Sequence, residues 1–449
     1  MKKILIVLLF FSNKAYAQPG KPLPAYLQLQ PPVFSLSMVM MHDVVNPPAA
    51  SRFYSYALLG AYEITSQHDT TITPLSKLIK KYTPAAITSN RKKYDYRIAA
   101  VYSILETGKR MLPSGFMLQE QQDKYINSLK KSNINNNIID ASIEVANTVS
   151  QHIVAYAKTD GYGDLSAKLR YTPLKGEGYW YPTPPAYIEA VEPNWRIIRP
   201  MLIDSCNQFP PLPPQEFSKD STSAFYGMAK EVYDISKNLT PEQLHIASFW
   251  DCNPFVVNTS GHMSIGYKKI SPGGHWMNIT GIACRKASLG FDEAVVLHTL
   301  VSVTLVDAFI SCWDEKYRSN RIRPETFINR HFDMHWQPLL QTPPFPEYTS
   351  GHSVISTAAA EVLSYFLGDN FPFTDDSEII FDIKERSFTS FRQAAEEAAV
   401  SRLYGGIHFK DAIVNGQSQG RAIGLKAVER MKDAGITPAK KGMVTFNKQ

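Results

Sequence analysis

The stretch DEAVVLHTLVSVTLVDAFISCWDE, residues 292–315, is nearly all apolar between its acidic ends, apart from His298 and Asp307. A helix that is apolar on every side is either buried in a large protein or placed in a membrane. Because lipid-exposed helices rarely carry ionisable residues at their centre, we interpret this stretch as a buried central helix. We interpret His298 as a satisfied core residue. We expect the Asp307 carboxylate to pair with one of the nearby cations, since an unpaired buried carboxylate is costly.

Helical patterns flank this stretch on both sides. Apolar residues recur at helical spacing over most of the chain, and no run of alternating strands is present. One helix start is explicit, because Thr240 is a typical N-cap residue and Pro241 follows at the first helical position. The patterns predict further helices over residues 51–66, 96–112, 141–158, 240–250, 350–367, 387–404 and 415–433. The sequence therefore predicts an all-α fold built from helical bundles.

One long segment cannot be helical. Residues 171–216 contain ten prolines together with Trp180, Tyr181, Tyr187 and Trp195. Helices do not continue through such a density of proline, and the aromatic residues favour a packed loop over a disordered linker. We expect this loop to separate two halves that each resemble a four-helix bundle. The predicted divisions are a signal peptide (1–17), an extended lead-in (18–34), an N-terminal helical part (35–170), the proline/aromatic-rich loop (171–216), a C-terminal helical part (217–435) and a tail (436–449).

The N-terminus has the pattern of a secretory signal peptide. Lys2 and Lys3 precede an apolar run over residues 4–11, and Ala15-Tyr16-Ala17 supplies small residues at the two positions read by a signal peptidase. The run is shorter than the ~20 residues that a membrane span needs. We therefore expect cleavage after Ala17. The mature chain is expected to be soluble, periplasmic or secreted, and without a membrane span.

Composition narrows the function classes. Of the 449 residues, 44% are hydrophobic and 20% are charged, which is typical of a globular protein. A net charge of +6 without a long Lys/Arg run is too weak to indicate a nucleic-acid binder. The cysteines lack the short Cys-x-x-Cys spacing that is typical of structural zinc sites, and their disulfide pairing stays open among three possibilities. They are Cys206, Cys252, Cys284 and Cys312, of which the last is expected to be a buried free thiol.

Three short motifs in the last third of the chain carry the chemistry. The first, KYRSNRIRP, starts at Lys316 at the end of the central helix and places Arg323 before a proline. The second, Ser350-Gly351-His352, has a serine N-cap at a helix start, where free backbone N–H groups form a ready anion site. A protonated histidine there would oppose the helix dipole, so we expect a neutral imidazole or a bound anion.

The third motif, SRLYGGIH, runs from Ser401 to His408 and carries Arg402 at a helix end before two glycines. Each motif alone is typical of ordinary helix ends and caps. Together they supply three cations, a helix N-terminus with a hydroxyl, and two histidines. This set of groups can bind a tetrahedral oxyanion and move protons around it.

The three motifs in this order resemble the signature shared by vanadium-dependent haloperoxidases and the type 2 phosphatidic-acid-phosphatase acid phosphatases, namely Lys-x6-Arg-Pro, Ser-Gly-His and Ser-Arg-x5-His. The resemblance implies an all-α fold. It implies that His408 is the axial vanadium ligand in a haloperoxidase or the phosphorylated nucleophile in a phosphatase, and that His352 is the acid–base residue. The residues implied to hold the oxyanion oxygens are Lys316, Arg323, Ser350, Gly351 and Arg402.

Several features resemble the haloperoxidase branch. Trp313 and Phe345 stand where haloperoxidases shape the halide pocket, and the loop around Trp180 resembles the proline-aromatic loop of bacterial haloperoxidases. The simple acid phosphatases of the superfamily are much shorter than this chain. The likeness to exported iodide- or bromide-oxidising enzymes of marine Bacteroidetes implies vanadate as cofactor, hydrogen peroxide and a halide as substrates, and phosphate as a competitor for the site.

Two other functions stay open on the sequence. The same residues could hydrolyse phosphomonoesters through phospho-His408 in a periplasmic acid phosphatase. A non-catalytic exported oxyanion-binding protein would also use the cations, although binding alone does not need two histidines.

Two positions depart from the family pattern. Thr349 replaces the proline that commonly precedes Ser-Gly-His, and Ala412 replaces an acidic residue that often orients the last histidine. Asp411 stands one residue early, so if it cannot reach His408 another acceptor must fix the imidazole tautomer. Two further histidines, His262 and His275, are expected on a loop surface, with the mouth of the site as the alternative. Phe255 is a candidate pocket residue.

Overall fold

The computed structural model describes residues 23–87, 93–260 and 263–439. The predicted signal peptide and residues 440–449 of the predicted tail lie outside the described residues. Within the described part, α-helices dominate, and the strands form two short antiparallel hairpins. The prediction of an all-α fold is confirmed.

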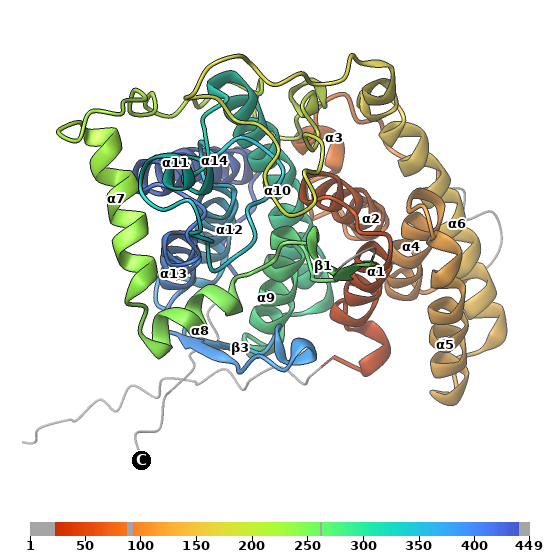
Figure 1. Ribbon diagram of the computed structural model, residues 1–449. Helices are drawn as coiled ribbons and strands as arrows, with labels where there is room; N and C mark the ends of the chain where they lie inside the picture. The colour runs from red at the N-terminus through yellow and green to blue at the C-terminus, as the bar shows by residue number, and fades with distance from the viewer. Residues whose placement is uncertain (1–22, 88–92, 261–262, 440–449) are drawn as a thin grey trace, which may run out of the picture.

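The N-terminal half is a helical bundle in which α2 packs against α4, and α4 packs against α6 (Figure 1). Its helices are α1 (Gln30–His42), α2 (Pro47–His68), α3 (Leu75–Leu78), α4 (Tyr96–Met111), α5 (Leu118–Lys131) and α6 (Asn136–Ala157). The extended lead-in predicted for residues 18–34 is wrong from Gln30 onward. Pro31 and Pro32 lie in the first turn of α1, where a backbone N–H has no helical acceptor and proline is tolerated.

The C-terminal half contains α7 (Ala224–Lys237), α8 (Pro241–Phe249), α9 (Pro272–Lys286), α10 (Phe291–Ser319), α11 (Pro324–His331), α12 (Gly351–Leu367), α13 (Phe391–Tyr404) and α14 (Lys410–Asp433). Its hairpins pair β1 (Val256–Ser260) with β2 (Met263–Tyr267), and β3 (Phe373–Asp375) with β4 (Arg386–Phe388). The helix predicted over residues 387–404 starts later, at Phe391, because residues 386–388 pair with β3. Thr240 caps α8 in a capping box, as the sequence indicates.

Helix α10 is the central element of the molecule. It packs against α2 of the N-terminal half and against α12 of the C-terminal half, and Figure 1 shows it between the two groups of helices. It is the one helix among the described residues that is long and apolar enough to cross a membrane, and its apolar window is buried entirely inside the protein. The interpretation of residues 292–315 as a buried central helix is confirmed, and both halves share this helix as their common core.

Asp307 on α10 does not pair with a cation of the site, so that expectation is wrong. Its carboxylate accepts hydrogen bonds from the backbone N–H groups of Met201, Leu202 and Ile203 at 2.7, 2.6 and 2.9 Å. Burial raises the pKa of Asp307 to about 6. The long loop approaches the helix as a row of N–H donors, which sequence spacing does not reveal.

The proline/aromatic-rich loop runs along one edge of the molecule between α6 and α7 (Figure 1). Trp180 and Trp195 are fully buried, as expected for a packed loop. The backbone N–H of Trp180 donates to the Asn320 carbonyl at 2.8 Å, and the backbone N–H of Val191 donates to the Pro344 carbonyl at 3.0 Å. The loop is therefore fastened to the segments that follow α10 and precede α12.

Three glycines on α14 let it approach α12 closely. Gly416, Gly420 and Gly424 recur every four residues on one face of α14. A Cβ added at Gly420 would lie 2.3 Å from the Val354 carbonyl oxygen of α12, and one at Gly416 would lie 3.1 Å from the Ser350 carbonyl oxygen. This close packing sets the position of the Ser350-Gly351-His352 segment relative to α14.

We expect Gly420→Ala to destabilise the protein by about 1–3 kcal/mol, because the obstructing atoms are backbone and the two helices must separate. Gly227→Ala on α7 is the matched control. A Cβ there meets nothing within 4 Å, and the substitution should stabilise the helix by about 0.5–1 kcal/mol. Urea denaturation of both variants measures the difference, and equal effects at the two positions would contradict the packing argument.

His298 lies in α10 with its Nδ1 2.8 Å from the Ala294 carbonyl oxygen, which makes Nδ1 the donor. Its Nε2 has no hydrogen-bond partner among the described residues, so the imidazole is only half satisfied. Burial lowers its pKa to about 4, from an ordinary value near 6.5. The folded protein therefore keeps this side chain neutral in mild acid, where the unfolded chain protonates it.

The free energy of unfolding should therefore fall as the pH is lowered from 6.5 to 4, with up to about 3 kcal/mol of the loss due to His298. Above pH 6.5 the loss is absent, because the His298 side chain is then neutral in both the folded and the unfolded protein. His298→Leu should remove that part of the pH dependence. Urea denaturation at the two ends of this pH range tests it, and an unchanged slope in the variant would contradict the assignment.

Candidate active site

A small cavity of about 40 Å³ lies at the start of α12, between the two halves of the molecule. That volume accommodates roughly three water-sized groups. The cavity wall brings together residues of the second and third sequence motifs and the two residues predicted to shape the halide pocket. Those residues are Trp313, Phe345, Gly351, His352, Arg402 and His408. Ser350 caps the helix, since its Oγ accepts from the Ser353 N–H at 3.4 Å.

Two buried arginines flank the cavity. The Arg323 Nε donates to the Phe345 carbonyl at 3.0 Å and its Nη1 donates to the Ile407 carbonyl at 2.9 Å, which fixes the guanidinium. Its Nη2 has no hydrogen-bond partner within the described part of the chain. Arg402 is held by its Nη2 on the Trp250 carbonyl at 2.7 Å. An arginine held rigidly with a donor to spare is well suited to bind an anion.

The His408 imidazole is oriented by a carboxylate. Its Nδ1 lies 2.8 Å from Glu347 Oε1, so Nδ1 carries the proton and donates it, and Nε2 keeps its lone pair. The Arg323 Nη1 donates to that Nε2 at 3.2 Å. Burial and the charges of Arg323 and Lys316 hold the pKa of His408 well below its usual value. The imidazole is therefore neutral, as a metal ligand or a nucleophile must be.

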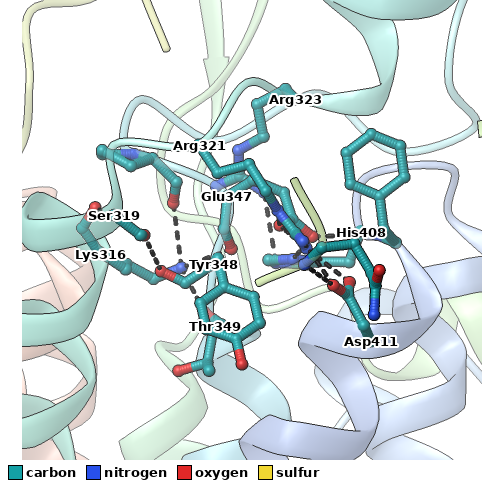
Figure 2. Close-up of polar contacts among 12 residues, drawn as sticks. Lys316, Ser319, Arg321, Arg323, Glu347, Tyr348, Thr349, His408 and Asp411 are labelled. Atoms are coloured by element: carbon teal, nitrogen blue, oxygen red, sulfur yellow. Dashed lines mark hydrogen bonds and ion pairs between the residues drawn. The ribbon is translucent and has the colours of Figure 1, made fainter. Parts of the chain in front are cut away.

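Glu347 belongs to a buried network that sequence reasoning missed (Figure 2). Its Oε2 accepts from the Arg321 Nε at 2.7 Å, and Arg321 also binds Asp411 in a bidentate pair at 2.6 and 2.7 Å. Asp411 thus pairs with Arg321 and not with His408. Glu347 is the acceptor that fixes the His408 tautomer, in place of the acidic residue that the family often has at the position of Ala412. The sequence signal was weak, because Glu347 lies 61 residues before His408.

Lys316 is buried next to the same loop, but its ammonium faces the backbone in this structure. Its Nζ donates to the carbonyls of Pro346, Glu347 and Thr349 at 3.1, 3.0 and 2.6 Å, which uses all three of its protons. Burial lowers the pKa of Lys316 to about 7. Lys316 therefore fastens the loop that carries Glu347 (Figure 2), and it is not among the residues that line the cavity.

Thr349, which stands where the family commonly has proline, is satisfied in two ways. Its hydroxyl donates to Gln419 Oε1 at 2.8 Å, and its carbonyl accepts from Lys316. The loop before α12 is thus held by side-chain contacts rather than by a proline ring.

His352 faces the cavity with a free nitrogen. Its Nε2 is buried without a hydrogen-bond partner among residues 23–87, 93–260 and 263–439. Burial, together with the charge of Arg402 and the neighbouring His408, lowers its pKa well below the usual value. The neutral imidazole expected at this helix N-terminus is therefore what the structure contains.

Part of the cavity wall is apolar. The rings of Trp313 and Phe345 lie 4.9 Å apart between centroids, and the Trp313 Nε1 donates to the Val191 carbonyl of the long loop at 3.1 Å. Phe255 also lines the cavity, as predicted from the sequence, and Pro47 reaches it from the N-terminal half. Polar and apolar side chains therefore line one small space.

Two histidine expectations have different outcomes. His262 lies outside the described residues. His275 was expected on a loop surface, and that is wrong, because it is fully buried in the first turn of α9. All four cysteines are free thiols, which agrees with the expectation for Cys312.

Comparison with known proteins now decides the family. The model of the VCPO second helical-bundle domain matches residues 296–435, which contain all three motifs. A solved structure described as the first bacterial vanadium-dependent iodoperoxidase is 42% identical in sequence, with a TM-score of 0.83 over 92% of this chain and 97% of that chain. The chain belongs to the vanadium-dependent haloperoxidases. A search of curated proteins gives no match.

More distant haloperoxidases share the fold. A bacterial vanadium-dependent chloroperoxidase in its holo form has a TM-score of 0.61 at 14% identity, covering 88% of this chain and 93% of that chain. Its apo form has a TM-score of 0.63 at 16% identity, covering 87% and 95%. The likeness extends over both helical halves, so the N-terminal bundle is part of the haloperoxidase fold and not an unrelated addition.

Proposed function

We propose that this haloperoxidase binds vanadate in the cavity at the start of α12 and uses hydrogen peroxide to oxidise iodide or bromide to hypohalous acid. The observation that carries the proposal is that His352 and His408 line the cavity while Arg323 contacts His408 next to it. The Nη2 of Arg323 and the Nε2 of His352 are buried without partners among the described residues, and the Nε2 of His408 keeps its lone pair. An arginine N–H donor, a neutral imidazole that can accept a proton and a second imidazole that can act as a nitrogen ligand fit a small oxyanion.

The residues divide into five roles. Arg323 and Arg402 would supply positive charge to the anion, the backbone N–H groups of Gly351 and His352 would supply dipoles, and His408 Nε2 would be the metal ligand. When bound, vanadate would supply a Lewis acid that activates hydrogen peroxide while the vanadium stays V(V). His352 Nε2 accepts the proton that hydrogen peroxide releases, since its lowered pKa keeps it neutral. Lys316 and Ser350 hold the loop and the helix start from behind.

The apolar wall favours a large, weakly hydrated halide. Trp313 and Phe345 exclude water from the side of the cavity that faces the long loop. Iodide and bromide lose hydration more readily than chloride, so they enter such a space at lower cost. The similarity to a bacterial iodoperoxidase supports the same preference.

The test is triiodide formation by the purified protein loaded with orthovanadate, in iodide and hydrogen peroxide. We expect turnover that requires vanadate and that falls when inorganic phosphate is added in excess, because the two oxyanions share shape and charge. The same preparation with bromide and chloride then ranks the halides. A folded, vanadate-loaded sample with no turnover of any halide would refute the proposal.

A phosphatase remains the second candidate, for a specific reason. A neutral, buried imidazole with an unprotonated Nε2 is also what a phosphohistidine mechanism needs, with His352 as the proton donor and acceptor. The phosphatase function would be favoured if the protein hydrolyses p-nitrophenyl phosphate without vanadate and the His408→Ala variant does not. Vanadate retention without turnover of either substrate class would favour a non-catalytic oxyanion-binding protein.

We also propose that the protein is exported and cleaved after Ala17. The support is the sequence pattern at the N-terminus, which lies outside the described residues. N-terminal sequencing of protein recovered from the periplasm and from the medium should begin at Gln18.

A further inference from the structure

A second cluster of buried polar residues lies next to the oxyanion cavity. Cys252 follows α8, His275 is in the first turn of α9, Asp375 ends β3, and Glu378 follows that strand. Each of them is at most 2% exposed. Cys252 also lines the oxyanion cavity, so the two sites share a wall.

The distances within the cluster match those around a tetrahedral cation. The His275 Nδ1 lies 3.4 Å from Cys252 Sγ and 3.3 Å from Glu378 Oε1, and the three ligand atoms lie within 4.8 Å of one another. Ordinary zinc bond lengths with tetrahedral angles give about 3.6 Å between sulfur and nitrogen and about 3.3 Å between nitrogen and oxygen. The two measured edges therefore fit one central ion.

The fourth residue, Asp375, orients the histidine. Its Oδ2 lies 2.7 Å from His275 Nε2, and its Oδ1 accepts from the Ser377 N–H at 3.0 Å. A carboxylate on one imidazole nitrogen fixes the tautomer that presents the other nitrogen to a metal. Here that other nitrogen, Nδ1, is the one that faces Cys252 and Glu378.

The Glu378 carboxylate lies 3.3 Å from the His275 Nδ1, but no hydrogen bond in the described part of the chain reaches it. Both of its carboxylate oxygens are buried and lack hydrogen-bond partners within the described residues. A buried, unpaired carboxylate is costly, and His275 is already engaged by Asp375. A divalent cation bound by a thiolate and a carboxylate would leave their local charge at zero.

We propose that Cys252, His275 and Glu378 bind one divalent cation of the zinc class, with Asp375 holding the histidine in place. Thiolate, imidazole and carboxylate together suit Zn²⁺ among the common ions. The sequence does not show this site, because its ligands lie at positions 252, 275 and 378 and contain no short Cys-x-x-Cys pair. This inference does not depend on the proposed halide chemistry.

The cation would also support the oxyanion cavity. The Trp250 ring stacks on His275 with centroids 4.7 Å apart, and the Trp250 carbonyl accepts from the Arg402 Nη2 at 2.7 Å. The Trp250 backbone also hydrogen-bonds His352. Fixing Cys252 therefore fixes the segment that positions an arginine and a histidine of the active site.

The first experiment measures metal in the full-length protein purified without chelators. Elemental analysis should find about one zinc per chain, counted separately from vanadium, either as purified or after addition of ZnCl₂ and desalting. Replacing the metal with Co²⁺ should give a thiolate-to-cobalt charge-transfer band in the near ultraviolet. X-ray absorption at the zinc edge should show one sulfur and several nitrogen or oxygen neighbours.

Two variants and one matched control assign the site. Cys252→Ser and Glu378→Gln should lose most of the bound zinc and the cobalt band. Cys284→Ser should keep both, because Cys284 lies 3.6 Å from the buried His298 but belongs to no group of three potential metal ligands among the described residues. Circular dichroism checks that each variant is folded.

Several results would overturn the proposal. If the wild-type protein takes up neither Zn²⁺ nor Co²⁺, the proposal is wrong, and no variant is needed to show it. Retention of the cobalt band in Cys252→Ser, or its loss in Cys284→Ser, would place the metal elsewhere. Because zinc content is read independently of turnover, an inactive enzyme with one bound zinc would contradict only the halide proposal.

Discussion

His408→Ala is expected to abolish vanadate retention and to lower iodide-oxidising turnover by roughly 10²–10³-fold or more, since removal of even one preorganised contact in an active site costs that much. The hydrogen bond from the His408 Nδ1 to Glu347 leaves the His408 Nε2 unprotonated, and this nitrogen accepts from the Arg323 Nη1 at 3.2 Å. Alanine leaves the arginines in place, so the anion could still enter but would have no nitrogen ligand.

Equilibrium dialysis against orthovanadate measures retention, and triiodide formation measures turnover. His298→Leu is a suitable control, because it removes another buried histidine from α10 that does not line the cavity. It should keep vanadate and activity. Full activity in His408→Ala would refute the assignment of the ligand.

Glu347→Gln is expected to weaken vanadate binding by roughly 10–100-fold, the usual cost of losing a partner behind a metal ligand. It should also lower the free energy of unfolding by about 3–5 kcal/mol, because a buried arginine loses a charged partner. Glu347 is a positioning residue: Oε1 holds His408 Nδ1 and the Phe409 N–H, while Oε2 holds Arg321. A glutamine amide cannot accept on both sides.

Asp411→Asn separates the two effects. Asp411 pairs with the same Arg321 but makes no hydrogen bond to His408, and its side chain is 12% exposed. It should lower stability with little change in vanadate affinity. Dialysis and urea denaturation of both variants give the two readouts, and equal losses of affinity would show that Glu347 acts only through stability.

The sequence predicted the parts of the fold that depend on local patterns. Helix α10 was predictable because its residues are apolar on every side, and α8 because Thr240 and Pro241 mark its start. Helix α1 was missed because its prolines resemble a loop, although proline is allowed in a first helical turn. The short strand β4 was missed because its pairing with β3 is a contact between segments and has no local signal.

The candidate site shows the same division. The second and third motifs named residues of the cavity wall, and the first motif named Arg323, which contacts His408 beside the cavity. The role of each atom depended on contacts between segments. Lys316 reaches three carbonyls about thirty residues away, and Asp307 reaches N–H groups more than one hundred residues away.

By itself, then, the sequence determined the helical class, the central buried helix and the set of cations and histidines that we propose to bind an oxyanion. These follow from periodicity, capping and residue type, which are properties of neighbouring residues. Only the tertiary structure decided that Glu347 orients His408, and that Cys252, His275 and Glu378 meet in one buried cluster. Such pairings follow from which donors and acceptors remain unsatisfied once distant helices pack, and no local pattern in the chain encodes that.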